Sequence, residues 1–236
     1  MPDVGVRAPP ARLVARASVG GGVALLTFDV SPRVRASFTH PGQYAEVIVG
    51  SDNGFFVIAS DVDAAKWELL MRGGGGAADA LLAMPLGTDV TMSSALGEGF
   101  PCERAEGRSL VVAVTGTGIA AARPIVALRL ARAHAQPMAP TEVYVGVRYA
   151  EDVPLADELS TWRAHGVRVT VCLSRADPTA RELETGHYAR GYVQDVLRAR
   201  LARGAPWLVF AVGAAGMVDG VRDVARELGA EVRTNY

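Results

Sequence analysis

The 236-residue chain has few cysteines and almost no lysine. Its two cysteines, Cys102 and Cys172, are too few and too far apart for a disulfide framework or a zinc site. Two cysteines also exclude an iron–sulfur cluster ligated by this chain alone, because such clusters usually need more thiolates than that. Lys66 is the only lysine, so arginine supplies nearly all the positive charge, a bias that we attribute to the base composition of the genome.

Neither sign of charge is in excess. The 24 basic residues are balanced by 25 acidic ones, which gives a net charge of −1. A nucleic-acid-binding domain normally gathers a basic excess on one face, so we expect no nucleic-acid partner. The longest apolar run, Trp207–Val218, is shorter than the ~18 residues of a membrane span. No apolar run follows Asp3 near the N-terminus, so we expect no signal peptide, no membrane span and a cytoplasmic protein.

Hydrophobic residues are plentiful, at 50% of the chain, and this content excludes intrinsic disorder. The length fits one large domain or two small ones. Before residue 105, short apolar runs alternate with turn residues, which is typical of an antiparallel barrel or sandwich. One helix is predicted there, at Ala77–Met84. The predicted strands are Val23–Val30, Tyr44–Val49, Phe55–Ala59, Trp67–Met71 and Val90–Met92.

After a polar linker at Glu103–Arg108, predicted strands and helices alternate. Five apolar strands separated by helices are typical of a doubly wound parallel sheet with helices on both faces. The predicted domains are therefore residues 1–105 and 106–236. The predicted strands are Ser109–Val114, Glu142–Val147, Val167–Leu173, Trp207–Val212 and Glu231–Thr234. The predicted helices are Ile119–Ala135, Leu155–His165, Val193–Arg203 and Met217–Leu228. We interpret Arg123, Arg129 and Arg132 of the first helix as a solvated face.

Candidate binding residues follow the predicted parallel strands, because ligands bind beyond the carboxyl ends of such strands. Thr115–Ile119 combines glycines with a helix start, which favours an anion; a tight turn without a ligand is the alternative. Ser174 and Arg175 suit a phosphate monoester and Tyr192 suits an adenine ring, and a solvated loop is the alternative. The small residues of Gly213–Met217 leave room for a flat ring, or serve close packing of strand on helix.

Six of these segments, in this order, resemble the ferredoxin–NADP reductase superfamily, and within it the kiwi-fruit-protein-like branch. Pro41-Gly42-Gln43-Tyr44 resembles the start of a barrel strand in that family, and Phe55–Ser60 resembles its flavin strand. Leu96–Phe100 resembles its turn at the end of the barrel, and Gly116–Ala120 its pyridine-nucleotide loop. The implied fold is an N-terminal antiparallel β-barrel of the flavin-binding type followed by an α/β doubly wound parallel five-stranded sheet.

The resemblance implies FAD in the barrel and NADPH or NADH in the α/β domain, with hydride passing from the nicotinamide to flavin N5. The electrons would continue to an unknown acceptor, such as an iron–sulfur or other redox protein. We lean to NADP over NAD, because Ser174, Arg175 and Tyr192 match the positions of the NADP-specific branch. Phe56 and Tyr236 are the implied catalytic residues. Phe56 would stack on the flavin ring, and so would the aromatic Tyr236, for which a frayed tail after the last strand is the alternative. The implied cofactor-binding residues are Gln43, Tyr44, Phe56, Val57, Ile58, Ala59, Ser60, Arg72, Gly75, Gly76, Ala77, Ala78, Thr115, Gly116, Thr117, Gly118, Ile119, Arg148, Ser174, Arg175, Tyr192, Gln194, Gly213 and Met217.

The sequence also departs from the family pattern. The flavin strand usually carries arginine and serine where this chain has Gly54 and Val57, and the next flavin motif lacks its hydroxyl at Ala78. Arg72 would then supply the missing charge. A cysteine often stands beside the nicotinamide, at the position of Val212. These losses motivate the alternative hypothesis of a degenerate, non-catalytic nucleotide-binding regulatory or partner subunit.

Overall fold

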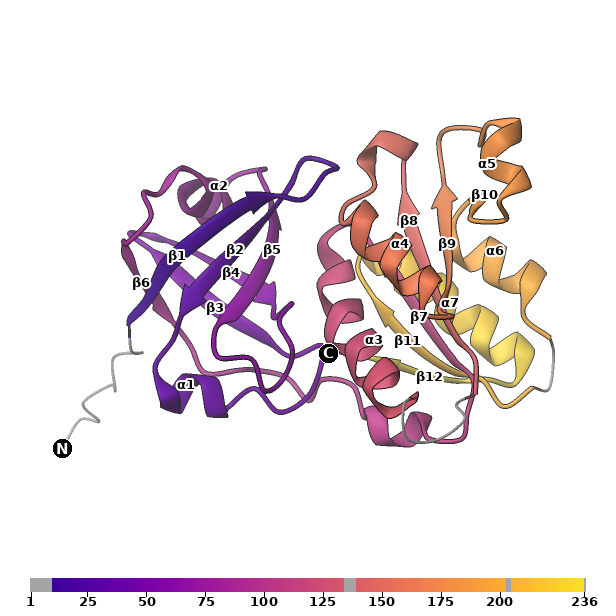
Figure 1. Ribbon diagram of the computed structural model, residues 1–236, viewed down its shortest axis with the longest axis horizontal. Helices are drawn as coiled ribbons and strands as arrows, with labels where there is room; N and C mark the ends of the chain where they lie inside the picture. The colour runs from indigo at the N-terminus through magenta and orange to yellow at the C-terminus, as the bar shows by residue number, and fades with distance from the viewer. Residues whose placement is uncertain (1–9, 134–138, 203–204, 236) are drawn as a thin grey trace.

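The computed structural model describes residues 10–133, 139–202 and 205–235. Within these residues the chain forms two domains that lie side by side, an antiparallel β domain followed by a parallel α/β domain (Figure 1). The predicted two-domain class is therefore confirmed, while the boundary between residues 105 and 106 stays a prediction. No helix in the described ranges is both long and apolar enough to cross a membrane.

The first domain is a six-stranded antiparallel sheet in the order β4-β3-β6-β1-β2-β5. An antiparallel bridge between Ile58, just beyond β4, and Leu69 of β5 joins the two edges and closes the sheet into a barrel. The first strand was not predicted, because Arg12 and Arg16 interrupt its apolar residues. The elements are β1 (Pro10–Ser18), β2 (Val23–Asp29), α1 (Pro32–Ala36), β3 (Tyr44–Val49), β4 (Asp52–Val57), β5 (Trp67–Arg72), α2 (Gly76–Ala83) and β6 (Asp89–Met92).

The second domain is a parallel sheet in the order β10-β9-β8-β7-β11-β12. It has six strands, so the predicted count of five is wrong. The additional strand, β10, has only three residues and lies at the edge of the sheet, which is too short for a recognisable apolar run. The strands are β7 (Leu110–Thr115), β8 (Thr141–Val147), β9 (Arg168–Leu173), β10 (Tyr188–Arg190), β11 (Leu208–Val212) and β12 (Glu231–Thr234).

Helices cover both faces of this sheet. The α helices are α3 (Ile119–Ala133), α4 (Ala156–Ala164), α5 (Ala180–Glu184), α6 (Val193–Arg200) and α7 (Ala215–Leu228). Short 3-10 turns are η1 (Cys102–Ala105), η2 (Gly116–Gly118) and η3 (Ala150–Asp152). Alternate residues of β7 serve the two faces: Val112 and Val114 pack with α3 and α4, and Val111 and Ala113 pack with α6 and α7. Burial on both faces explains why these strands read as continuous apolar runs.

Arg123 joins the two domains. From α3 its Nη1 donates to Glu68 Oε2 at 2.7 Å and to the Ala59 carbonyl at 3.1 Å, both in the barrel. Its Nε donates to Glu158 Oε2 of α4 at 2.8 Å. Burial alone lowers the pKa of Arg123, but the hydrogen bonds to Glu158 and Glu68 outweigh that effect and raise it. The prediction that Arg123 lies on a solvated face is therefore wrong.

Arg129 was also assigned to the solvated face, and this prediction is wrong too. The residue is 3% exposed, and its guanidinium donates to Thr141 Oγ1 and to three backbone carbonyls. Those carbonyls belong to Ala105 and Arg108, which precede β7 in the chain, and to Ala139, which precedes β8. Arg129 therefore fixes the linker onto the α/β domain, whereas Arg132 is exposed as expected and pairs with Glu106.

Two further contacts hold the barrel against the α/β domain. The β1–β2 turn lies on the segment before α4, where Leu155 N donates to the Val19 carbonyl at 2.7 Å. Gly21 is needed there, because a Cβ would lie 2.2 Å from the Asp152 carbonyl oxygen. At the other contact, the rings of Phe100 and Phe210 stack with centroids 4.6 Å apart. Because both contacts are tightly packed, the two domains are held in a defined relative position.

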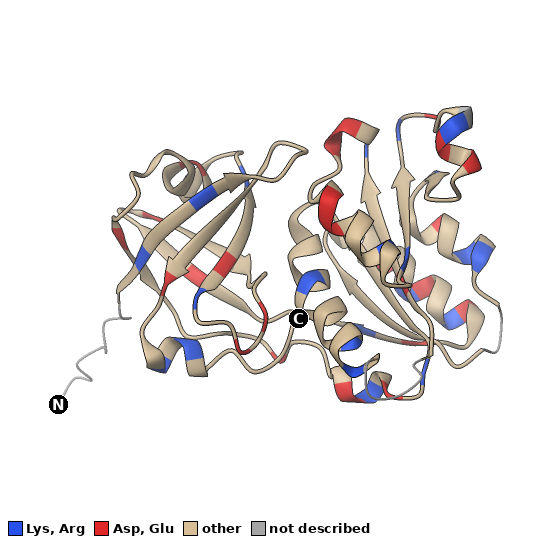
Figure 2. Cartoon of the chain, in the orientation of Figure 1, with Lys and Arg blue, Asp and Glu red and all other residues tan. Residues whose placement is uncertain are grey.

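Charged residues of both signs are interspersed over the helices and loops of the two domains, and neither sign dominates the view in Figure 2. This distribution agrees with the balanced composition.

The ion-pair geometry of Arg123 predicts its contribution to stability. Arg123→Met keeps most of the side-chain volume but leaves two carboxylates, each no more than about a third exposed, without their cation. We expect the free energy of unfolding to fall by about 2–4 kcal/mol, measured by urea denaturation. Arg132→Met on the same helix removes an exposed pair and should cost less than about 1 kcal/mol. Equal losses in the two variants would contradict the role of Arg123.

Candidate functional site

A cleft of about 1210 Å³ lies between the barrel and the carboxyl ends of the parallel strands. It opens where β7 has β8 on one side and β11 on the other, so that the chain connections leave in opposite directions. Such a switch point is the expected ligand position in a doubly wound sheet. Of the predicted binding residues, the cleft is lined by Phe56, Val57, Arg72, Thr115, Gly116, Thr117, Gly118, Arg148, Ser174, Tyr192, Gln194, Gly213 and Met217.

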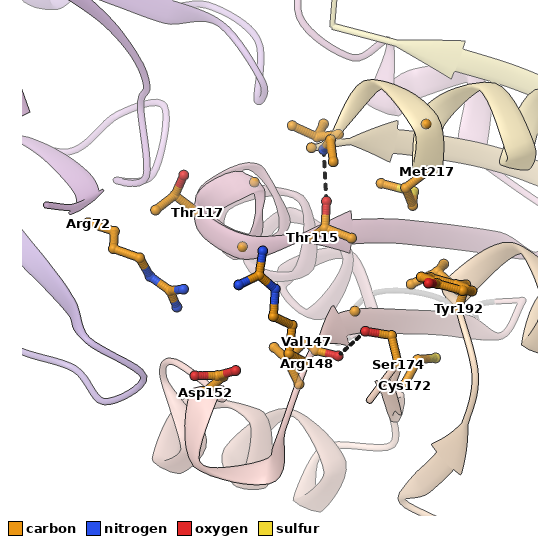
Figure 3. A pocket seen from close by; sticks show the side chains of 18 of the residues that line it. Arg72, Thr115, Thr117, Val147, Arg148, Asp152, Cys172, Ser174, Tyr192 and Met217 are labelled. Carbon is orange, nitrogen blue, oxygen red and sulfur yellow. Dashed lines mark hydrogen bonds between the residues drawn. The ribbon is translucent and has the colours of Figure 1, made fainter. Parts of the chain in front are cut away.

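The loops after β7 and β11 form one side of the cleft and hold each other in place. Thr115 Oγ1 accepts a hydrogen bond from Ala214 N at 2.8 Å (Figure 3). A Cβ at Gly118 would lie 2.7 Å from the Val212 carbonyl oxygen, so this glycine is needed for close packing of the two loops. Gly116, by contrast, has nothing within 4 Å of its Cβ position and lies open to the cleft. The close-packing alternative therefore applies to Gly118, whereas Gly116 has open space beside it and its anion-binding role stays a prediction.

Two arginines face the same space from opposite domains. Figure 3 shows Arg72 projecting from the barrel side and Arg148 from the α/β side. Arg72 Nη2 donates to the Gly21 carbonyl at 2.6 Å, which holds it at the rim. Among the described residues neither arginine has a carboxylate within ion-pair distance, so both positive charges are available to an anion in the cleft.

The far end of the cleft carries hydroxyl and aromatic groups. Ser174 Oγ donates to the Val147 carbonyl at 3.2 Å, which leaves its lone pairs free to accept. Tyr192 is 58% exposed and lies beside the strand end that carries Ser174 (Figure 3). The Gln194 Oε1 atom is buried and has no hydrogen-bond partner in the described residues. Arg175 is exposed and does not line the cleft, so the structure does not bring it together with Ser174 and Tyr192.

The barrel wall of the cleft is largely apolar. Phe55 is 61% exposed and packs edge-on against Tyr44, with ring centroids 5.9 Å apart. Phe56 is half-buried over Gly54, where a Cβ would lie 2.8 Å from its ring. The glycine at position 54 is therefore required by the Phe56 ring, and an arginine would not fit there without moving it. Both phenylalanines line the cleft, although the sequence singled out only Phe56.

The glycine-rich loop before α2 is occupied by a side chain of its own helix. Gly74 N donates to Asp79 Oδ1 at 3.0 Å and Gly75 N donates to Asp79 Oδ2 at 2.8 Å. Of these two amides, that of Gly75 belongs to the segment Gly75–Ala78 that was predicted to bind the cofactor. In this structure a carboxylate takes the place that an anionic ligand would fill there.

Several predicted residues do not reach the cleft and serve the barrel instead. Gln43 Oε1 accepts from Thr39 N and His40 N, and its Nε2 donates to the Gly97 carbonyl. Ser60 Oγ accepts from Glu68 N at 3.3 Å. Tyr236 lies outside the described residues. Outside the cleft lining lie Gln43, Tyr44, Ile58, Ala59, Ser60, Gly75, Gly76, Ala77, Ala78, Ile119 and Arg175, whose cofactor-binding roles stay predictions.

The cleft also contains residues that sequence reasoning missed. Cys172 lies at its floor with the thiol buried, and burial raises the pKa of that thiol to about 12. Asn235 follows β12, is 6% exposed and reaches across to the barrel, where its Nδ2 donates to the Gly42 carbonyl. No sequence pattern marks either residue. The other missed residues are Phe55, Leu70, Gly146, Val147, Tyr149, Asp152, Gly191 and Val193, whereas Val212, Ala214 and Gly216 belong to a segment that the sequence had marked.

Comparison with known proteins identifies the fold. Residues 112–223 match the family described as the oxidoreductase NAD-binding domain. A crystal structure of an Amycolatopsis cytochrome P450 reductase, GcoB, superposes with a TM-score of 0.80 at 22% identity, covering 97% of this chain and 70% of that one. The chain has the ferredoxin–NADP reductase fold. The resemblance drawn from the six motifs is thus confirmed at the level of the fold, and residues 112–223 are similar to the NAD-binding domain family.

Two other similar proteins agree with this assignment. A ferredoxin–NADP⁺ reductase from Neisseria gonorrhoeae, solved with bound FAD and NADP, superposes with a TM-score of 0.75 at 15% identity, covering 98% of this chain and all of that one. The fruit protein pKIWI502 of Actinidia deliciosa is 26% identical over 204 residues. That alignment covers 80% of this chain and 62% of the fruit protein, so the chain spans less than two thirds of that relative.

The raised pKa of Cys172 predicts its reactivity. The thiol stays protonated at pH 8, and only the thiolate reacts quickly, so iodoacetamide should leave Cys172 of the native protein unmodified. Cys102 is buried as well, with its pKa likewise raised to about 12 by burial. Peptide mass spectrometry after a short exposure should therefore find both cysteines unlabelled in the native protein and both labelled in urea. Rapid native labelling of Cys172 alone would show that the cleft floor is a reactive site.

Proposed function

We propose that this chain is an FAD-dependent NAD(P)H oxidoreductase whose cleft holds flavin on the barrel side and nicotinamide nucleotide on the α/β side. The observation that carries the proposal is a cleft shared by the two domains, with an apolar aromatic wall facing an anion-binding loop. When bound, the flavin would accept a hydride from the nicotinamide and release electrons to an acceptor. An iron–sulfur or other redox protein is the acceptor class that we propose.

The α/β side fits a dinucleotide. The open backbone at Gly116 and Thr117, directly before α3, suits a pyrophosphate, and Arg148 adds a positive charge beside it. Tyr192 offers an exposed ring for stacking, and Gln194 has a buried acceptor without a partner. A buried polar atom without a partner is costly, so Gln194 points to a ligand that donates to it. These residues would bind and orient the nucleotide across the ends of β7, β8 and β9.

The barrel side fits a flat ring system. Phe55, Phe56, Val57 and Leu70 supply apolar surface, and they would exclude water from the face of a bound flavin. Arg72 stands at the rim of this wall, where it would pair with a phosphate of the same cofactor. With Val212 in place of the family's cysteine, the nicotinamide would rest on an apolar side chain, and no thiol would take part at that position.

One observation favours the second candidate, a non-catalytic nucleotide-binding subunit. Asp79 fills the amides of the loop at Gly74 and Gly75, so a flavin pyrophosphate there must displace a carboxylate. In the oxidoreductase proposal the pyrophosphate would either expel Asp79 or rely on Arg72. The two candidates therefore differ in whether flavin is bound at all.

Purified protein tests the proposal directly. We expect bound or readily incorporated FAD, seen in the visible absorption spectrum, and NADPH or NADH oxidation with a dye such as ferricyanide as acceptor. Nucleotide binding without FAD uptake or turnover would support the non-catalytic subunit. Protein that binds neither FAD nor a nicotinamide nucleotide would contradict both.

Substitutions of two arginines test where the phosphates of the nucleotide bind, because one arginine lines the cleft and the other is exposed outside it. Arg148→Ala should weaken NADPH binding by about ten- to a hundredfold, because a charge-assisted phosphate contact is lost from the cleft. Arg175→Ala is the comparison, because Arg175 is exposed outside the cleft. Its proposed role at the 2′-phosphate requires a rise in KM for NADPH but not for NADH. Equal changes for the two nucleotides would exclude that role, and an unchanged Arg148→Ala would move the phosphates away from this strand end.

A further inference from the structure

Asn235 is built into the junction between the two domains. It follows β12, the edge strand beside β11, and its Nδ2 donates across to the Gly42 carbonyl of the barrel at 3.2 Å. A Cβ at Gly42 would lie 2.5 Å from the Phe100 ring, so the glycine is needed for that ring, while Asn235 Cβ would lie at an ordinary contact distance of 3.5 Å. Asn235 is 94% buried by this packing, since only 6% of it is exposed, yet it lines the cleft.

The contact with Gly42 fixes the orientation of the amide. A carbonyl oxygen can only accept, so the NH₂ end of Asn235 must face Gly42 and the Oδ1 end must face away. Oδ1 is fully buried and has no hydrogen-bond partner among the described residues. Flipping the amide would bring two oxygens together. The unpaired atom is therefore an acceptor, held by a defined hydrogen bond on the other side of the same group.

An unpaired buried acceptor is costly, and such atoms call for a partner that the protein itself does not supply. The neighbouring barrel wall cannot provide one, because Phe55, Phe56, Val57 and Leu70 have apolar side chains. That wall offers no side-chain acceptor either, since its polar member is the cationic Arg72. Asn235 Oδ1 is thus an unpaired side-chain oxygen of a residue that lines the cleft, and a ring bound against the wall would have to bring an N–H group to it.

We propose that Asn235 is a cofactor-binding residue whose Oδ1 accepts a hydrogen bond from an amide-type N–H of a redox cofactor in the cleft. The inference rests on the proposed function and adds a residue that forms a hydrogen bond with the cofactor. The same chemistry has two sources, a ring N–H of the flavin and the carboxamide of the nicotinamide. Asn235 also tethers the domains through Gly42, so a test must separate the acceptor from the tether.

Asn235→Ala removes the acceptor, and three equilibrium measurements show which donor it served. If the donor is a flavin N–H that is present in both redox states, the variant should bind FAD with a dissociation constant about five- to thirtyfold higher than that of the wild type, measured by fluorescence titration. If the donor is a flavin N–H that is present only after reduction, the variant should have a lower flavin midpoint potential. The decrease is about 30 mV if the affinity for reduced flavin falls tenfold more than the affinity for oxidised flavin. A carboxamide donor predicts weaker NADP⁺ binding to the FAD-loaded protein, with unchanged binding of 2′-phospho-ADP-ribose, which lacks the nicotinamide.

Two further variants separate acceptor from tether. Glu68→Gln weakens the domain interface at Arg123, outside the cleft, and an acceptor role predicts that it shifts the three measurements much less than Asn235→Ala does. Asn235→Asp keeps a side-chain oxygen that can accept but loses the donor to Gly42, so an acceptor role predicts that it binds the cofactor more tightly than Asn235→Ala. If Asn235→Ala matches Glu68→Gln, or Asn235→Asp is as weak as Asn235→Ala, the acceptor role is overturned.

The failure of this inference is distinguishable from failure of the proposed function. Wild-type protein is titrated with FAD and NADP⁺ first, and binding of neither would overturn the proposed function together with the role of Asn235. Wild-type binding combined with unchanged constants in Asn235→Ala would overturn the role of Asn235 alone. Thermal unfolding of each variant, expected within a few degrees of the wild type, confirms that the altered constants come from folded protein.

Discussion

The relative position of the two domains depends on the guanidinium of Arg123. It lies on α3 and donates to the barrel through Glu68 and the Ala59 carbonyl, and to α4 through Glu158. Only about one helical turn separates Arg123 from Gly118, where the loop after β7 passes into α3. A rigid helix therefore connects the clamp between the domains directly to the loop, so the distance from the barrel wall to the loop cannot change without disturbing the ion pairs.

Packing and electrostatics support each other at this interface. The hydrophobic cluster beneath α3 and α4 continues into the barrel through Val23, Ala59, Leu70 and Phe100. Carboxylates beside such apolar surface would be costly if unpaired, and Arg123 neutralises two of them with hydrogen bonds of short length. The cleft lies between the two domains where this apolar packing ends. Its aromatic wall and its polar loop thus face each other because the contacts around them are rigid.

The sequence predicted the structure best where a run of one kind of residue corresponds to one kind of environment, such as apolar residues in a buried strand. Runs such as Leu110–Thr115 are buried on both faces and read directly as parallel strands, whereas the three residues of β10 carry no such signal. Helical periodicity placed Arg123 and Arg129 on a polar face, but periodicity cannot show that a second domain or a linker covers that face. The loop residues at strand ends were predictable because topology brings them together.

The parts of the cleft that were not predictable depend on contacts between distant segments. Asn235 meets Gly42 across 193 positions of sequence, and Asp79 turns back on its own loop. Phe55 and Phe56 are adjacent in the sequence and both line the cleft, but only the structure shows that it is Phe56 that packs over Gly54. Such details arise from side-chain geometry, which a single sequence does not encode in any local pattern.

The chain order of the Arg123 contacts has a consequence for biosynthesis. Ala59 and Glu68 precede Arg123, whereas Glu158 follows it by 35 positions. During translation the barrel can fold first and offer two acceptors to α3 as that helix leaves the ribosome. The nascent α3 would then dock before its own sheet is complete, with the earlier domain serving as a template for the later one.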